Sequence, residues 1–208
     1  MLHLATSSEA RIPSPTIPGG WHVTVALKHL PRFPGWNIEN CSQAEIVGGP
    51  RWLWEAKNSR WVNDRKPLED HLRESGREGL LADESGCLLE GLTSNLFVIA
   101  EIRPGEFEVQ TAAVHHRVLE GIMRRHVLQA CAHLRLPLQE ISPVPRQAST
   151  WRAAFLTSSV RLMQPLDAIF AAADRHALSA YVNALGDRPT TYYDVERLLT
   201  AAARHASL

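Results

Sequence analysis

The sequence lacks the features that define several large classes of protein. It has no excess of charge of either sign, because 22 lysines and arginines balance 22 aspartates and glutamates. A chain without a basic surplus has no general attraction for nucleic acid or for an anionic membrane surface. None of its apolar runs approaches the roughly 20 residues that a membrane-spanning helix needs. We therefore expect neither nucleic-acid nor membrane partners.

Cysteine is scarce as well. The three cysteines, Cys41, Cys87 and Cys131, are odd in number and widely spaced, which indicates reduced side chains of an intracellular protein rather than a disulfide framework. Neither an H-E-x-x-H motif nor a paired Cys/His motif is present, so no metal site is expected. The first 20 residues lack the apolar core of a signal peptide and the arginine-rich pattern of a transit peptide. A cytoplasmic location is expected, with an organellar one left open.

What the chain does contain is the pattern of a globular protein with both strands and helices. Its 208 residues are 45% hydrophobic and 21% charged, enough for one sizeable domain or two small ones. Short apolar runs predict strands at 21–27, 44–47, 79–83, 107–110, 138–141, 153–156 and 162–167. Helices are predicted at 121–134 and 190–205, with a short one at 144–150 and helical character in the second half of 51–75, interrupted by Pro67.

A hairpin around Glu90 organises the rest of the chain. Residues 87–99 read C-L-L-E-G-L-T-S-N-L-F-V-I, two apolar runs on either side of a turn of small residues. Glu90 lies at the inner edge of this hairpin. If its carboxylate is buried there, it needs a hydrogen bond or a counter-charge. The hairpin by itself is equally compatible with a Glu90 that points into water, as most glutamates do.

Two lysines precede the hairpin. Lys57 lies in a tryptophan-rich stretch with Trp52, Trp54 and Trp61, whereas Lys66 lies among charged residues and is typical of a solvated helix face. A lysine held among aromatic rings loses hydration, and its neutral amine becomes nucleophilic. Lys57 is therefore the candidate nucleophile, although most lysines are simply surface cations.

Two segments have the character of an anion site. Gly121 precedes the predicted helix 121–134, and the free N–H groups and positive dipole of a helix N-terminus suit a phosphate. Many helices begin in this way without binding anything. Thr157, Ser158 and Ser159 follow a predicted strand, and three consecutive hydroxyls either line an anion site or simply cap and turn the chain.

Taken in order, four segments between Lys57 and Asp167 resemble the fold-type IV pyridoxal-phosphate enzymes, the class IV aminotransferases. The segments are A-K-N-S-R-W-V, L-L-A-D-E-S-G-C-L-L-E-G-L-T-S-N-L-F-V-I, L-E-G-I-M-R-R and A-F-L-T-S-S-V-R-L-M-Q-P-L. This family holds branched-chain and D-amino-acid aminotransferases and aminodeoxychorismate lyase. The stretch W-V-N-D-R-K-P-L-E is most similar to its plant-type members.

The resemblance implies a role for each candidate residue in binding pyridoxal 5′-phosphate. Lys57 matches the lysine that forms the Schiff base with the cofactor, and Glu90 matches the acid that pairs with its pyridine nitrogen. Asn95 falls in the turn beside the cofactor. The phosphate-binding positions are matched by the backbone of Gly121, Ile122 and Met123 and by the hydroxyl residues Ser158 and Ser159.

The resemblance also implies an α/β fold, the C-terminal large domain of such an enzyme, with a mixed sheet or open barrel over residues 21–170 covered by helices. Residues 1–50 would be the remnant of an N-terminal lobe and a linker, and residues 51–208 the cofactor-binding domain, so that the chain is N-terminally shortened. A homodimer is expected, because family members dimerise with the cofactor near the interface.

Three departures from the family pattern accompany the match. Only the last strands of the N-terminal lobe have a counterpart, around residues 21–47, and its phosphate-binding arginine has none. The tyrosine after the lysine is Trp61 or Val62, and the Pro-Gly before the phosphate helix is Glu120-Gly121. The predicted function is a transaminase that acts on an amino acid and a keto acid through a lysine Schiff base. The alternatives are a lyase of the aminodeoxychorismate type and a catalytically silent homologue that serves as a binding or dimerisation module.

Overall fold

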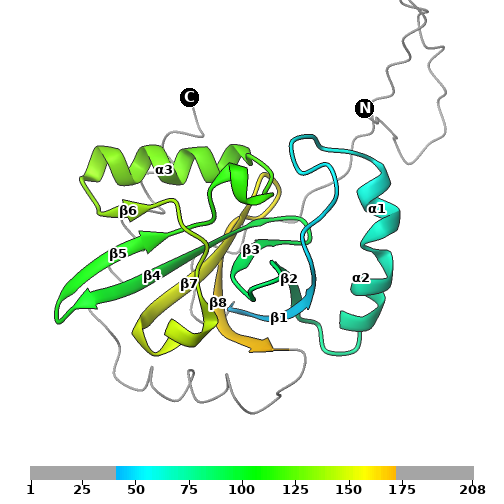
Figure 1. Cartoon of the computed structure of the whole chain (residues 1–208), viewed down its shortest axis with the longest axis horizontal. Coiled ribbons are helices and arrows are strands. Elements are labelled where there is room, and N and C mark those ends of the chain that lie inside the picture. Colours follow the sequence, from blue (N-terminus) through cyan, green and yellow to red (C-terminus); the bar gives the residue numbers. More distant parts are fainter. Residues whose placement is uncertain (1–40, 172–208) are drawn as a thin grey trace, which may run out of the picture. The chain divides into compact units, whose positions relative to one another are not determined.

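The computed structural model describes residues 41–171 (Figure 1). Within this range the strands are β1 (Ser42–Gly48), β2 (Glu78–Ala82), β3 (Leu88–Gly91), β4 (Asn95–Arg103), β5 (Glu106–Gln110), β6 (Leu138–Gln139), β7 (Trp151–Ser158) and β8 (Leu162–Ala171). The α-helices are α1 (Arg60–Asp64), α2 (Lys66–Leu72) and α3 (Ile122–Leu134), and 3₁₀-helices span Val114–His116 and Pro145–Thr150. The predicted strand 21–27 and helix 190–205 lie outside the described residues.

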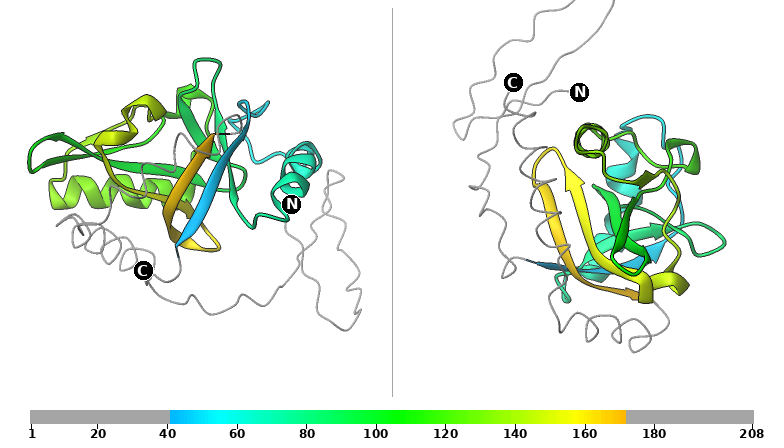
Figure 2. Two further views of the ribbon diagram at one scale, coloured as in Figure 1. Left: turned by 90° about the horizontal axis from the view of Figure 1, so that it is seen from below. Right: turned by 90° about the vertical axis from the view of Figure 1, so that its left-hand side faces the viewer.

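The strands form one mixed sheet that curls into a partial barrel. Their order is β3-β2-β1-β8-β7-β4-β5-β6, and an additional pairing between β3 and β4 joins the first six of them into a ring. β1 runs parallel to β2 and β8, and the left view of Figure 2 shows β1 (blue) and β8 (orange) side by side, pointing the same way. β7 is antiparallel to both β4 and β8. The sheet continues beyond the ring through β5 and β6.

The β3–β4 hairpin closes the ring through the pairing of Glu90 with Asn95. Its turn is tight, because the Gly91 N–H donates to the Ser94 carbonyl at 2.7 Å. A Cβ at position 91 would lie 2.2 Å from Ser94 Oγ. A larger residue at this position would therefore require the Ser94 side chain to move.

Strand β4 shows how the core is built on both faces of the sheet. Successive side chains of a strand point to opposite faces, so Leu96 and Val98 pack inside the barrel while Phe97 and Ile99 pack against α3. A third cluster lies between α2 and the barrel, where Leu72 packs with residues of β2 and β3. Figure 1 shows α3 and the pair α1 and α2 on different flanks of the sheet.

One end of the barrel gathers segments that lie far apart in the sequence. β2 begins there at Glu78, β3 ends at Gly91, and β4 begins at Asn95. The register pairs Gly91 with Leu80 and Asn95 with Thr157. The Glu90 hairpin and the hydroxyl residues after β7 therefore share this end of the barrel.

The predicted α/β fold, a mixed sheet in an open barrel covered by helices, is confirmed. The hairpin, the strand before it and the helix that begins after Gly121 are present as predicted. The predicted interruption near Pro67 is present: the helical stretch is divided at Arg65 into α1 and α2. Pro67 lies in the first turn of α2, where the missing N–H of proline has no intrahelical acceptor to lose. Residues 145–150 form a 3₁₀-helix in place of the predicted short helix. The predicted domain boundary at residue 50 stays a prediction.

Two further properties of the described residues bear on the class of protein. Cys41, Cys87 and Cys131 are all free, as predicted. None of the helices in the described part of the chain is long and apolar enough to cross a membrane.

Candidate active site

Glu90 is buried at the closed end of the hairpin, with only 3% of its surface exposed. Its Oε1 lies 2.9 Å from the guanidinium Nε of Arg51. Its Oε2 accepts hydrogen bonds from the backbone N–H of Leu119 at 2.9 Å and from the Asn95 side chain at 3.4 Å. Oε1 is therefore in an ion pair and Oε2 accepts hydrogen bonds, so Glu90 is the buried, partnered carboxylate of the two interpretations that the sequence left open.

The environment of Glu90 brings its titration close to neutral pH. Burial raises the pKa of the Glu90 carboxyl to about 7, against the opposing effects of the Arg51 charge and the Leu119 N–H. A nearby positive charge favours the ionised form of a carboxyl group. A further cation placed beside Glu90 would therefore make the carboxylate the dominant form, and a group with a pKa near the working pH is typical of acid–base sites.

Asn95 connects the hairpin to the start of α3. Its side-chain N–H donates to the Leu119 carbonyl at 2.8 Å. A Cβ at position 121 would lie 2.2 Å from Asn95 Oδ1, so the amide of Asn95 occupies the space that any larger residue than Gly121 would need. The structure thus brings three of the predicted positions, Glu90, Asn95 and Gly121, into one connected cluster.

The N-terminus of α3 has the properties expected of an anion site. Gly121 is its N-cap residue, in an extended conformation, and no side-chain hydrogen bond caps the helix. The first N–H groups of a helix have no acceptor within it, and they form the positive end of its dipole. Ile122 is 57% exposed at this end, while Met123 is buried in the protein.

The two departures from the family pattern nearest this cluster have local explanations. The carboxylate of Glu120 lies 4.0 Å from Arg125 Nε, and both side chains are more than half exposed, so its charge is solvated and partly compensated. Trp61 donates its indole N–H to the Leu92 carbonyl at 2.7 Å. The indole N–H of Trp61 is therefore occupied by a hydrogen bond to the hairpin turn.

The hydroxyl triplet 157–159, at the end of β7, is divided between different environments. Ser159 is exposed, and Ser158 is half-buried, with its Oγ accepting a hydrogen bond from the Arg161 N–H at 3.1 Å. Thr157 is buried opposite Asn95, and its Oγ1 has no hydrogen-bond partner among the described residues. The hydroxyl nearest the cluster in the register is therefore Thr157, which the sequence offered only as part of the triplet, whereas the resemblance selected Ser158 and Ser159.

Lys57 lies in an irregular segment before α1, and its side chain is exposed. It makes no hydrogen bond or ion pair with any residue in the part of the chain that the structure describes. The expectation that neighbouring tryptophans remove its hydration is wrong here, because Trp52 is itself 67% exposed. Lys66, the first residue of α2, is exposed as predicted. The structure does not bring Lys57 into contact with the Glu90 cluster.

Two buried arginines act on the Glu90 carboxyl and were not predicted. Arg51 is 7% exposed and pairs with Glu90. Arg124, in the first turn of α3, is 1% exposed and donates to the Ala112 carbonyl at 2.8 Å. Arg124 has its own ion pair with Glu140 at 2.6 Å, and it acts on Glu90 only through its charge, which lowers the pKa of that carboxyl. A buried glutamate requires a partner, but the sequence contains too many arginines for that rule to select Arg51.

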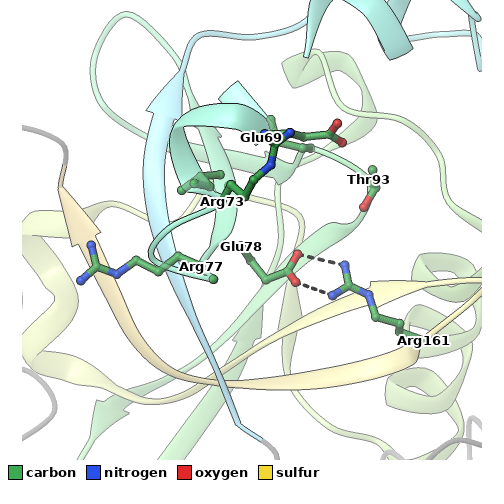
Figure 3. A pocket seen from close by; sticks show the side chains of 10 residues that line it. Glu69, Arg73, Arg77, Glu78, Thr93 and Arg161 are labelled. Carbon is green, nitrogen blue, oxygen red and sulfur yellow. Dashed lines mark hydrogen bonds and ion pairs between the residues drawn. The ribbon is translucent and has the colours of Figure 1, made fainter. Parts of the chain in front are cut away.

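A pocket of about 290 Å³ lies next to the hairpin turn, between α2, β2 and the turn before β8 (Figure 3). Its lining includes Thr93 but none of the predicted site residues. In Figure 3 the Arg161 guanidinium makes two contacts with the Glu78 carboxylate, one of them at 2.9 Å. Arg73 and Arg77 have ion pairs of their own. The pocket therefore lies apart from the Glu90 cluster, and acidic partners already compensate its arginines.

Comparison with known proteins identifies the family. The model of the amino-transferase class IV family matches residues 10–169, a range that includes every predicted site residue. The chain belongs to this family.

Solved structures share the fold at low sequence identity. A hypothetical aminotransferase from Mycobacterium tuberculosis in its PLP-bound form is 15% identical, with a TM-score of 0.62 over 79% of this chain and 56% of that one. A branched-chain aminotransferase from Thermoproteus uzoniensis, solved with norvaline, is 19% identical, with a TM-score of 0.55 over 79% and 51%. A protein named as a 4-amino-4-deoxychorismate lyase from Legionella pneumophila is 18% identical, with a TM-score of 0.50 over 72% and 52%. The match thus spans about half the length of these relatives. A search of curated proteins returned no match.

Proposed function

We propose that the protein is a pyridoxal-phosphate-dependent aminotransferase that exchanges an amino group between an amino acid and a keto acid. The observation that carries the proposal is the buried Glu90 carboxylate, held by Arg51, Asn95 and the Leu119 N–H inside the region that matches the family. An ionisable group this deeply buried needs a reason beyond stability, because apolar packing is usually as stable.

The residues present fit the cofactor at its two ends. The uncapped N-terminus of α3 at Gly121 offers backbone N–H groups and a positive dipole to a phosphate, with the exposed hydroxyl of Ser159 as a further donor. Glu90 offers a carboxylate to a protonated ring nitrogen. When bound, the cofactor supplies an electron sink for a carbanion at the substrate α-carbon.

The protein's own residues then have separate tasks. Lys57 is the nucleophile, and its exposed amine has no competing partner in the described part of the chain. The same amine, once neutral, moves a proton at the substrate α-carbon. Glu90 holds the proton on the ring nitrogen through its negative charge, and Asn95 holds Glu90 and the start of α3 in fixed relative positions.

The related alternative is a lyase of the aminodeoxychorismate type, which would use the same lysine and cofactor. The structural similarity to the Legionella pneumophila protein, which is named as such a lyase, is the reason to test for this activity as well. A homodimer is also part of the proposal, by analogy with the family. A keto-acid acceptor separates the two activities, because only the transaminase requires it.

The proposal is tested by trapping the cofactor on its lysine. The protein is mixed with pyridoxal phosphate, reduced with borohydride and digested, and the phosphopyridoxyl group is located by mass spectrometry. We expect it on Lys57, lost in Lys57→Ala and retained in the matched control Lys66→Ala. Labelling confined to Lys66, or absent altogether, would contradict the proposal and favour a silent homologue.

A further inference from the structure

The segment that carries Lys57 is fastened to the Glu90 hairpin at both of its ends. We call residues 51–61 the lysine segment. At its start, Arg51 Nε lies 2.9 Å from Glu90 Oε1. At its end, Trp61 Nε1 donates to the Leu92 carbonyl at 2.7 Å. The two anchor points on the hairpin, Glu90 and Leu92, are separated by a single residue.

The two anchors also contact each other. The guanidinium carbon of Arg51 lies 5.8 Å from the centroid of the Trp61 ring, within the range of a cation–π interaction. Arg51 also donates a hydrogen bond from Nη2 to the Trp54 carbonyl at 3.2 Å, inside the lysine segment. The ends of the segment are thereby joined, and it has the form of a compact loop whose ends are close together.

Between the anchors, little else holds the segment in place. Trp52 is 67% exposed, and Lys57 is exposed. The position of Lys57 relative to Glu90 therefore depends on the two anchors.

We propose that Arg51 and Trp61 are positioning residues that hold the lysine segment against the Glu90 hairpin, so that the cofactor-binding lysine and the buried carboxylate form one unit. This inference rests on the proposed function of Lys57 and Glu90. It assigns a task to the indole that stands near the family's tyrosine position, because Trp61 contributes its N–H to the loop anchor.

Arg51 has a second task within the same arrangement. It is the counter-charge of Glu90, and its planar guanidinium reaches the carboxylate and the Trp54 carbonyl at the same time. A lysine in its place retains the charge but not this forked geometry. Replacement by lysine therefore separates the electrostatic task from the anchoring task.

The experiment compares the full-length protein with Arg51→Met, Arg51→Lys and Trp61→Phe, which keeps an aromatic ring but removes the indole N–H together with part of the ring volume. The matched controls are Trp52→Phe, an exposed tryptophan of the same segment, and Arg103→Met, an arginine in a solvent-exposed ion pair with Glu106. The first measurement is hydrogen–deuterium exchange over residues 51–61 without cofactor, where the Asn58 amide, bonded to the Ala56 carbonyl at 2.9 Å, is a reporter. The second is the pyridoxal-phosphate concentration that half-saturates the trapped label on Lys57.

We expect exchange in the lysine segment to rise in all three anchor variants and to stay unchanged in the controls. The half-saturating concentration should rise about tenfold, since a small misplacement of a reacting group costs one to two orders of magnitude. Unchanged exchange and unchanged half-saturation in Trp61→Phe and Arg51→Lys would overturn the inference, even if Arg51→Met failed to fold. If the wild-type protein traps no cofactor, the proposed function fails, and the exchange measurement alone decides whether the anchors hold the segment.

Discussion

The Glu90 hairpin and the lysine segment face each other across the candidate site, but they are held by different means. The hairpin is part of the barrel: its residues pair with both neighbouring strands, and Glu90 is 3% exposed with partners on both oxygens. The lysine segment has no regular structure before Arg60, and Lys57 is exposed. The proposed carboxylate partner of the cofactor is thus built into the sheet. The proposed nucleophile, Lys57, lies on a loop with two anchors.

The largest expected difference between the two regions is in stability. Glu90→Ala leaves Arg51 buried without its counter-charge, and breaking a buried ion pair on one side costs about 3–5 kcal/mol. We expect a loss of about this size in the free energy of unfolding, measured by denaturant titration. The matched control is Glu84→Ala, whose carboxylate pairs with Arg117 at 2.6 Å but is 75% exposed; its loss should stay below about 1 kcal/mol. Equal losses in both variants would contradict the buried pair.

A smaller effect is expected at the junction between the hairpin and α3. Gly121→Ala places a Cβ 2.2 Å from Asn95 Oδ1, so the Asn95 amide must move and its hydrogen bond to the Leu119 carbonyl must weaken. We expect a loss of about 1–3 kcal/mol in the free energy of unfolding. Gly49→Ala is the control, since nothing lies within 4 Å of a Cβ there. If Gly121→Ala were as stable as Gly49→Ala, the hydrogen bond between Asn95 and the Leu119 carbonyl would contribute little to stability.

The pH dependence of stability tests the burial of Glu90 directly. Its pKa is about 7 in the folded protein against 4.5 for the free group, so between these values the folded state binds more protons than the unfolded state. The part of the stability that depends on protonation of Glu90 is therefore fully present below about 4.5 and is lost as the pH rises through 7. We expect the free energy of unfolding of the wild type to fall, relative to Glu90→Gln, by roughly 1 kcal/mol per pH unit in this window. Parallel pH profiles for the two proteins would rule out a raised pKa at this site.

The smallest effect is expected in the lysine segment itself. Lys57→Ala removes an exposed side chain without a polar partner in the described residues, so the free energy of unfolding should change by no more than about 0.5 kcal/mol. The measurement is the same denaturant titration. A loss well above that value would mean that Lys57 is packed or paired, and the contrast between the two regions would then be weaker than the structure indicates.

The two regions also differ in how far the sequence predicts them. The hairpin can be predicted from residues that are neighbours in the sequence, because apolar runs flank Gly91, Ser94 and Asn95, residue types that favour turns. The helix after Gly121 and the strands that precede and follow the hairpin are local patterns of the same kind, and all are found near the predicted positions. The lysine segment has no such pattern, and its predicted burial among tryptophans is wrong because side-chain packing in a loop is not encoded by residue spacing.

By itself, the sequence determined the elements and the family resemblance, because hydrophobic periodicity and turn residues act between neighbours along the chain. Only the tertiary structure decided that Glu90 is buried and which residues hold it. Arg51 and Leu119 lie far from Glu90 in sequence and meet it because the barrel closes through the pairing of Glu90 with Asn95. A buried carboxylate requires a partner, but the choice of partner depends on strand register and loop closure, which are properties of the whole fold.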